Sequence, residues 1–325
     1  MFAYLIRRIL YAIPILLGVN LITFMLFFVV NTPDDMARAQ LGKKYVTSNM
    51  ITQWKVAHGY NLPLYYNAEQ TGFEKITDTL LVKKSLSQFS FNFGNSDQGR
   101  NINTDISQRM WPSLAIAVPT LFLSLFVDIV FALLLVFFRY TLFELSAVFV
   151  CVMLMSISGL FYIIAGQYVF AKVLQLVPIS GYEPGLSAWR FLLLPVVVAV
   201  ISGVGAGARW YRTIFMEEIS KEYVRTARAK GLSDLAVLFR HVLKNGMLPI
   251  LTGVVVVIPS LFMGSLLLES FFGVPGLGNY MIDAIRSQDF AIVRTMVFLG
   301  TIFYIIGLIL TDITYTLVDP RVRLE

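Results

Sequence analysis

Residues 111–138 read WPSLAIAVPTLFLSLFVDIVFALLLVFF, and Asp128 is the single charged side chain among them. An α-helix needs about 20 predominantly apolar residues to cross the hydrocarbon core of a bilayer. A helix at the surface of a soluble protein keeps a polar face toward water, and this stretch has none. It therefore predicts a membrane-spanning helix.

The same pattern recurs along the chain. Further apolar blocks cover residues 9–30, 145–173, 191–208, 248–268 and 293–318, so the sequence predicts six spans. Hydrophobic residues make up 57% of the 325, charged residues only 14%, and the mean hydropathy is +0.72. Soluble domains carry about 25% charged residues, which they need to face water. We therefore expect an all-α integral membrane protein.

The chain divides into three parts. Residues 1–30 hold the N-terminus and the first helix, which we expect to be retained because its apolar part exceeds the about 7–15 residues of a signal sequence. Residues 31–110 carry seven acidic and nine basic side chains and predict a soluble insert whose aromatic residues could fill a small core. Residues 111–325 hold the other five spans. Within them, the turn-rich segment 268–292 predicts either a partly embedded outer cap or a plain loop.

Basic residues predict the orientation. With a cytoplasmic N-terminus, the inner ends and loops hold thirteen Lys and Arg residues against four in the short outer connections. The nine in the long insert are exempt from this bias. Both termini and the loop 209–247 are therefore expected to be cytoplasmic, and the insert extracytoplasmic. The basic excess reports topology, so no nucleic-acid partner is expected.

The charged loop 209–247 predicts two short helices separated by a break. Its first part, from Met216, is rich in good helix formers. Gly231 suits the left-handed position that ends a helix, and Ser233 suits the N-cap of the next. Leu235, Leu238, Phe239 and Val242 then form one apolar stripe. Small residues at 227 and 229 would let another surface approach. Such a hairpin suits docking of a partner; a charged connector lying on lipid headgroups is the alternative.

The loop is similar to the cytoplasmic loop of ABC-importer permeases, in the form typical of the dipeptide/oligopeptide permease family. The matching residues are Tyr223-Val-Arg-Thr-Ala-Arg-Ala-Lys-Gly231, His241-Val-Leu-Lys-Asn245 and Leu248-Pro249. Other family-like stretches follow in the expected order: Arg7-Arg8, Gly59-Tyr-Asn-Leu-Pro63, Phe91-Asn-Phe-Gly94, Val177-Pro-Ile-Ser-Gly-Tyr182, Phe272-Gly-Val-Pro-Gly-Leu-Gly278, Gln288-Asp289-Phe290 and Asp319-Pro-Arg321. The resemblance covers essentially the whole chain.

This resemblance implies a type I ABC-importer permease fold in a bacterial cytoplasmic (inner) membrane, and the first permease of a pair. It implies a homologous second permease subunit, two ATPase subunits and an extracytoplasmic solute-binding protein as partners, besides membrane lipid. No cofactor is expected on this chain, because ATP and Mg²⁺ would be bound by the ATPase subunits. The residues that it assigns to ATPase coupling are Glu222, Tyr223, Arg225, Thr226, Ala227, Lys230, Gly231 and His241.

The chain departs from the family pattern in its path-forming helices. The third span has Ser156-Ile157-Ser158 where Ser-Ile-Pro is usual, and residues 131–138 lack the usual Gly-Pro-Gly. In the last span, Leu308 stands four residues before Asp312, where the family usually has an asparagine. We expect Asp312 itself to be structural. Ser156, Ser158 and Asp128 are our candidates for a pathway or partner interface. A bare charge inside a bilayer is costly, so we expect Asp128 to face protein or a water-filled path, or to be protonated. A local structural hydrogen bond is the alternative to the pathway or partner role.

Several other functions are disfavoured. Gly203-Val-Gly-Ala-Gly207 lies late in an apolar helix with no strand before it, so we expect a packing face and not a nucleotide site. No Gly-x-x-x-x-Gly-Lys-Ser/Thr occurs, and Cys151, His58 and His241 are too far apart to predict a zinc site. A membrane-bound enzyme is disfavoured, because the sequence places no cluster of His, Cys or carboxylate residues near a bilayer face. A stand-alone secondary transporter or channel is the alternative function, and it would need more intramembrane charges than Asp128. Peptides are the leading cargo, with metal chelates, oligosaccharides or opines as alternatives.

Overall fold

The computed structural model describes residues 2–42 and 45–318, and its regular structure is helical apart from an isolated β-bridge between Asn95 and Asn101. Within that part of the chain, five helices are long and apolar enough to cross a membrane: Ile6–Val30, Ile102–Phe137, Trp189–Ile219, Asp234–Met263 and Phe290–Thr314. A sixth span is present if a bent helix pair counts as one. The prediction of an all-helical chain with apolar spans is confirmed. Asp319-Pro-Arg321 lies outside the described residues.

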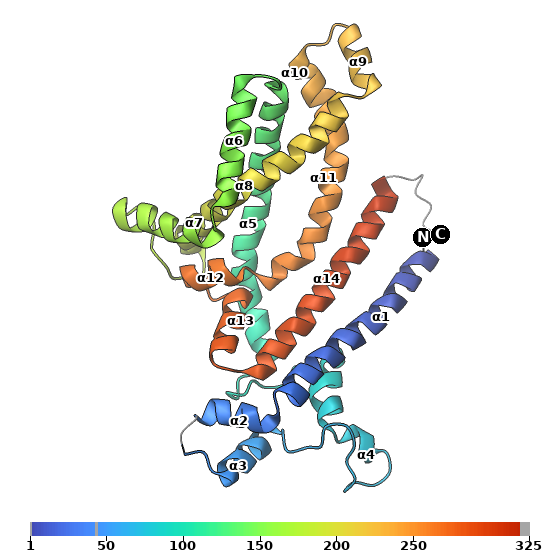
Figure 1. Ribbon diagram of the computed structural model, residues 1–325, viewed down its shortest axis with the longest axis vertical. Helices are drawn as coiled ribbons and strands as arrows, with labels where there is room; N and C mark the ends of the chain where they lie inside the picture. Colours follow the sequence, from blue (N-terminus) through green and yellow to red (C-terminus); the bar gives the residue numbers. More distant parts are fainter. Residues whose placement is uncertain (1, 43–44, 319–325) are drawn as a thin grey trace. The chain divides into compact units, whose positions relative to one another are not determined.

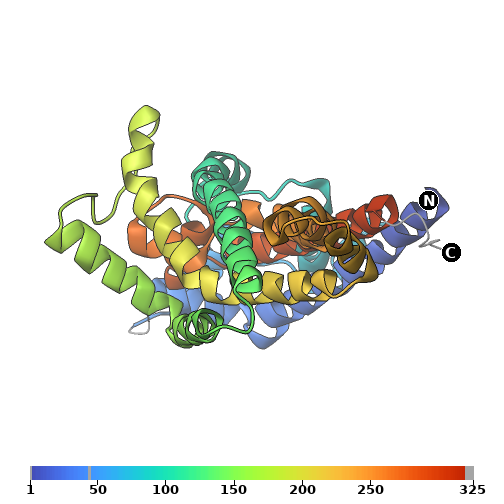
Figure 2. The same cartoon turned by 90° about the horizontal axis from the view of Figure 1, so that it is seen from above.

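The third apolar block is not the single helix predicted for residues 145–173. Helix α6 (Leu142–Ser156) ends at Ile157, which is extended with ψ 132°. Helix α7 (Gly159–Gly166) and the π-helix η4 (Gln167–Val173) then run at 90° to α6 (Figure 2). A β-carbon on Gly166 would lie 2.6 Å from the Val198 side chain. The end of α7 thus packs closely on Val198 of α8 (Trp189–Ile219), a contact between distant residues that the uniformly apolar sequence does not reveal.

The chain forms two compact units. One, here called the hairpin unit, comprises Met110–Asn279 and the end of the last helix; the other, the insert unit, comprises the chain up to Arg109 and Tyr280–Ile309. The long helix α5 (Ile102–Phe137) and helix α13 (Leu277–Arg286) each contribute residues to both units.

The hairpin unit is built around α8 (Trp189–Ile219), which follows a short 3-10 turn η5 (Leu186–Ala188). After it come α9 (Glu222–Ala229), α10 (Asp234–Val237), the π-helix η6 (Leu238–Leu243), α11 (Lys244–Val257) and the 3-10 helix η7 (Ile258–Met263). Figure 1 shows α9 and α10 side by side at the end of the long helices α8 and α11. The fourth span is thus longer than predicted, because α8 continues through residues 209–219 into the charged loop.

The glycine-rich part of α8 packs against two other helices. A β-carbon on Gly205 would lie 2.6 Å from the carbonyl oxygen of Cys151 in α6, and one on Gly207 would meet the carboxylate of Asp128 in α5. Gly203 faces open space. The predicted packing face is therefore confirmed, with two of the three glycines in contact.

The insert unit holds α1 (Phe2–Phe24), the π-helix η1 (Met25–Val30), α2 (Pro33–Leu41), α3 (Ser48–His58), α4 (Glu74–Thr77), the π-helix η2 (Leu81–Ser85), the 3-10 helix η3 (Leu86–Ser90) and most of α14 (Phe290–Val318). Its core contains the buried side chains of Phe24, Phe28, Met36, Ala37, Ile51, Trp54, Tyr60 and Leu80. The prediction that aromatic residues of residues 31–110 fill a small core is confirmed, and residues of the first helix join them.

Residues 268–292 are not a plain loop. They lie in α12 (Leu266–Phe272), α13 and the first residues of α14, with Gly273-Val-Pro-Gly276 between the first two helices. Gly273 takes φ +65° and ends α12. The plain-loop alternative is therefore wrong, and the partly embedded outer cap stays a prediction.

Candidate functional site

The backbone of the hairpin (residues 222–243) has the predicted break. Gly231 takes φ +83° directly after α9, and its amide donates to the carbonyl of Arg228 at 2.9 Å. Ser233 caps α10, because its hydroxyl accepts a hydrogen bond from the amide of Ala236 at 3.4 Å. An ion pair of 3.2 Å between Arg228 and Asp234 bridges the break. The turn is therefore held by backbone conformation, a cap and one charge pair.

The underside of the hairpin packs into the core of its own unit. The buried cluster consists of Ala132, Leu133 and Val136 of α5, Phe215, Val224, Ala227, Val237, Leu238, Val242 and Ile250. Ala227 is 5% exposed. It was expected to leave room for another protein, but its methyl group faces this internal core.

The four residues of the predicted apolar stripe do not lie on one face of the hairpin. Leu238 and Val242 are buried as expected, whereas Leu235 and Phe239 are 53% and 57% exposed. For Phe239 the reason is local: residues 238–243 form a π-helix, whose i→i+5 hydrogen bonds change the angle between successive side chains. Two apolar side chains are thus left on the outer surface of the hairpin.

The outer surface also carries most of the predicted coupling residues. Glu222, Arg225, Thr226, Lys230 and Gly231 are exposed. A 2.6 Å ion pair joins Glu222 to Arg225, and the Thr226 hydroxyl donates to the carbonyl of Glu222 at 3.1 Å. Exposed ion pairs of this kind contribute little to folding stability. These side chains remain available for contact with another protein.

Tyr223 and His241 lie at the base of the hairpin. The Tyr223 hydroxyl donates to Glu218 at 2.6 Å, and Glu218 also binds Lys221 at 2.5 Å. Burial, followed by this hydrogen bond, raises the pKa of Tyr223 to about 12. The rings of Tyr223 and His241 are 6.5 Å apart. Tyr223 is therefore a neutral hydrogen-bond donor at neutral pH, and it ties α9 to the end of α8.

The pathway candidates occupy two different places. Asp128 is 7% exposed, and its Oδ1 atom is buried with no hydrogen-bond partner. Ser156 and Ser158 are exposed at the break between α6 and α7, where the Ser156 hydroxyl donates back to the carbonyl of Val152 at 2.8 Å. The structure shows no hydrogen bond at Oδ1 that would support a purely local role for Asp128.

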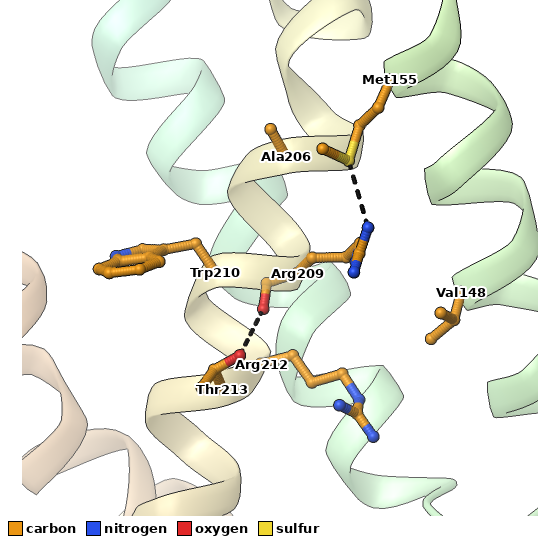
Figure 3. Close-up of a pocket in the computed structure, with 7 residues that line it drawn as sticks. All are labelled: Val148, Met155, Ala206, Arg209, Trp210, Arg212 and Thr213. Atoms are coloured by element: carbon orange, nitrogen blue, oxygen red, sulfur yellow. Dashed lines mark hydrogen bonds between the residues drawn. The ribbon is translucent and has the colours of Figure 1, made fainter.

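A cavity of about 350 Å³ lies between α6 and α8, beyond the glycine-rich stretch (Figure 3). It is lined by Val148, Met155, Ala206, Arg209, Trp210, Arg212 and Thr213. The Arg212 guanidinium pairs with Glu144 of α6, with 3.0 Å from Nε to the carboxylate. Arg209 has no ion-pair partner among the described residues, and its Nη1 lies 3.6 Å from the Met155 sulfur. One positive charge is thus left unneutralised beside this cavity.

Glu269 is a functional candidate that the sequence analysis missed. It is fully buried, and its carboxylate accepts hydrogen bonds from the amides of Ser265 at 3.1 Å and Asn279 at 3.0 Å. A β-carbon on Gly264 or Gly276 would collide with it. Gly264 and Gly276 therefore form a cradle around one carboxylate. Their spacing was the available signal, but it reads in the sequence only as a turn-rich segment.

We expect Glu269→Gln to destabilise the fold by about 1–3 kcal/mol, because its amide group would face backbone N–H donors. Burial raises the pKa of Glu269 above its usual value, although hydrogen bonds from Ser113 and backbone amides oppose the shift. Between pH 4.5 and the raised pKa of the folded state, the native protein binds more protons than the unfolded chain. The contribution of Glu269 to stability therefore falls as the pH rises through this range. Thermal unfolding across that range should show a shallower pH dependence in the variant. An unchanged midpoint and pH profile would contradict the cradle.

Comparison with known families matches residues 132–324 to the binding-protein-dependent transport system inner membrane component, and residues 1–87 to the N-terminal family of such membrane components. A probable peptide ABC transporter permease of Sinorhizobium fredii, y4tP, is 31% identical over 98% of this chain and 99% of that protein. The oligopeptide transport permease AppB of Bacillus subtilis is 26% identical over 99% and 100%. The dipeptide transport permease DppB of Alkalihalophilus pseudofirmus is 26% identical over the same shares.

Proposed function

Because this chain belongs to the family of binding-protein-dependent transport system inner membrane components, as a permease subunit of an ABC importer, we propose that it forms half of a translocation path for peptides. A homologous second permease would form the other half, and an extracytoplasmic binding protein would deliver the cargo. Peptides are proposed because the relatives above are named for peptide, oligopeptide or dipeptide transport.

We propose that the hairpin couples this subunit to ATP hydrolysis. The observation that carries this proposal is its construction: a buried underside joined to α5 and α8, and an exposed outer face with Leu235, Phe239 and several charges. A connector lying on headgroups would not require its own packed core. ATP and Mg²⁺ would be bound by two ATPase subunits, and this chain would have no hydrolytic role.

The orientation follows from the charge distribution. We propose that the hairpin and both termini are cytoplasmic and that residues 31–110 form a soluble extracytoplasmic insert, in agreement with the thirteen-to-four distribution of basic residues. The break at Ile157–Ser158 supports a pathway role for Ser156 and Ser158. Non-helical backbone at membrane depth is tolerated only where it contacts protein or water. Asp128, with its unpaired oxygen, is proposed to face the path or the second permease.

Reconstitution of the full transporter in vesicles tests this function. Uptake of labelled peptides should require ATP, the binding protein and this chain together. A cysteine at position 230 should react only from the side to which the ATPases bind, and one at position 70 only from the other side. Cys151, the natural cysteine, is buried and serves as the unreactive background. Uptake driven by an ion gradient through this chain alone would contradict the proposal and favour a secondary transporter.

A further inference from the structure

A second polar cavity lies within the insert unit, far along the chain from the hairpin. Its volume is about 200 Å³, and it lies between η2, η3 and the first turns of α14. Its lining includes three cationic side chains, Lys83, Lys84 and Arg294, of which Lys83 is paired with Asp78, and the polar side chains Gln88, Asn92 and Thr295. No acidic residue lines it. The cavity is therefore positive in character.

Arg294 is the most buried of these cations, at 4% exposure. Its Nε donates to the carbonyl of Phe290 at 3.2 Å, and its Nη2 donates to the hydroxyl of Tyr60 at 3.4 Å. The guanidinium also lies 4.6 Å from the centre of the Phe28 ring. Nη1 is buried and has no hydrogen-bond partner. A buried charged donor without an acceptor is costly, so the positive charge of Arg294 is incompletely compensated within the protein.

Lys84 supplies the second charge. Its ammonium donates to the carbonyl of His58 at 2.8 Å and lies 4.8 Å from the centre of the Tyr60 ring. Burial, and then the nearby charge of Arg294, lower the pKa of Lys84. Two cations thus share one cavity, and neither forms an ion pair with an acid among the described residues. An anion between them would relieve both the repulsion and the unpaired donor.

Two acids, Asp97 and Asp289, accept hydrogen bonds near these cations. Asp97 accepts from the Tyr60 hydroxyl at 2.9 Å and from the amide of Phe290 at 3.1 Å. Asp289 accepts from the amides of Asp97 at 3.2 Å and Ile292 at 3.3 Å, which places it as the cap of α14, while its Oδ2 has no partner. Neither carboxylate lines the cavity. The hydrogen bonds described for these two acids thus come from neutral donors, and neither acid forms an ion pair with Lys84 or Arg294 among the described residues.

We propose that this cavity binds the carboxylate group of a small anionic solute between the guanidinium of Arg294 and the ammonium of Lys84. Ionised donors form the stronger hydrogen bonds to a carboxylate, and the surrounding amide and hydroxyl groups supply neutral ones. The volume suits a small molecule and excludes a phospholipid or a folded segment of another protein. The proposal does not depend on the cargo of the transporter.

Binding of sodium acetate to the purified full chain in lipid nanodiscs tests the proposal, at constant ionic strength maintained with chloride. Acetate should raise the unfolding temperature saturably, neutral acetamide should not, and inorganic phosphate should bind more weakly than acetate. Lys84→Gln and Arg294→Gln should each weaken acetate binding by about 10- to 100-fold, the loss expected for one charge-assisted hydrogen bond. Lys55→Gln is the matched control, because Lys55 pairs with Asp34 at 2.7 Å and does not line the cavity.

Several outcomes would overturn the proposal. Equal stabilisation by acetate and acetamide, or unchanged affinity in Lys84→Gln, would remove the carboxylate site. Tighter binding of phosphate than of acetate would reassign the ligand class. Acetate binding that is seen only in Asp289→Asn would mean that Arg294 pairs internally with Asp289. Lys84 is only half-buried, so its variant keeps the test decisive if Arg294→Gln does not fold.

Discussion

Gly231→Val is expected to abolish coupled transport while leaving the protein inserted in the membrane. The φ of +83° at this residue strains a β-branched side chain by about 1–3 kcal/mol. No atom lies within 4 Å of the position that a β-carbon would take, so the substitution acts through the turn and through any partner at this surface. A shifted turn would separate Arg228 from Asp234 and tilt α9 relative to α10. If the strain at residue 231 disfavours the docking conformation by about 1.4 kcal/mol, the population of that conformation, and with it uptake, should fall about tenfold.

The measurement combines a pull-down of the ATPase subunits with hydrolysis stimulated by loaded binding protein. Gly72→Val is the matched control, because Gly72 has φ +63° and also faces open space, but lies in the insert unit. It should keep normal stimulation. If Gly231→Val also keeps normal stimulation and uptake, the hairpin is a connector on the headgroups, and the coupling assignment is wrong.

Gly205→Val should prevent stable packing of α6 on α8. A β-carbon at this position would lie 2.6 Å from the carbonyl oxygen of Cys151 and 3.0 Å from Met155. Backbone cannot swing aside as a flexible side chain can, so α6 itself must move. Overpacking of a close interface costs about 1–3 kcal/mol, and more when backbone must shift. We expect a lower yield and a lower unfolding temperature in detergent.

Gly203→Val provides the control for this second variant. It lies two residues earlier in the same helix and has no neighbour within 4 Å. Its unfolding temperature should stay close to that of the native protein. An equal loss in both variants would show that valine harms this helix in itself, and an unchanged Gly205→Val would remove the packing role of the glycine stretch.

The features that the sequence predicted are those set by local chemistry. The apolar spans are visible because each is a long block, and the hairpin turn because Gly231 and Ser233 are needed for a helix end and a cap. The features that it did not predict depend on distant parts of the chain. One is the bend after Ser156, beyond which α7 packs on Val198 of another helix, an arrangement that no apolar pattern encodes.

The candidate site shows the same division. The exposure of the charged coupling residues could be predicted from their charge. The outward position of Phe239, however, depends on a π-helix that helix propensities do not reveal. Glu269 was missed because its carboxylate is held by amides at 265 and 279 and by Ser113 in another helix. The sequence analysis used Arg294 only as one of the four basic residues in the outer connections. That its Nη1 is buried without a hydrogen-bond partner becomes apparent only in the folded insert unit.

Helix α8 has a mechanical consequence. It runs for 31 residues, from Trp189 to Ile219, with Pro195 near its start, and Tyr223 ties the hairpin to its end through Glu218. At about 1.5 Å per residue, its length along the axis is about 45 Å. A rod that pivots near its middle converts a displacement at one end into an opposite displacement of similar size at the other. A pull of about 2 Å on the hairpin would therefore tilt such a rod by about 5°, and leverage alone would carry the movement to the far end without any change in the helix.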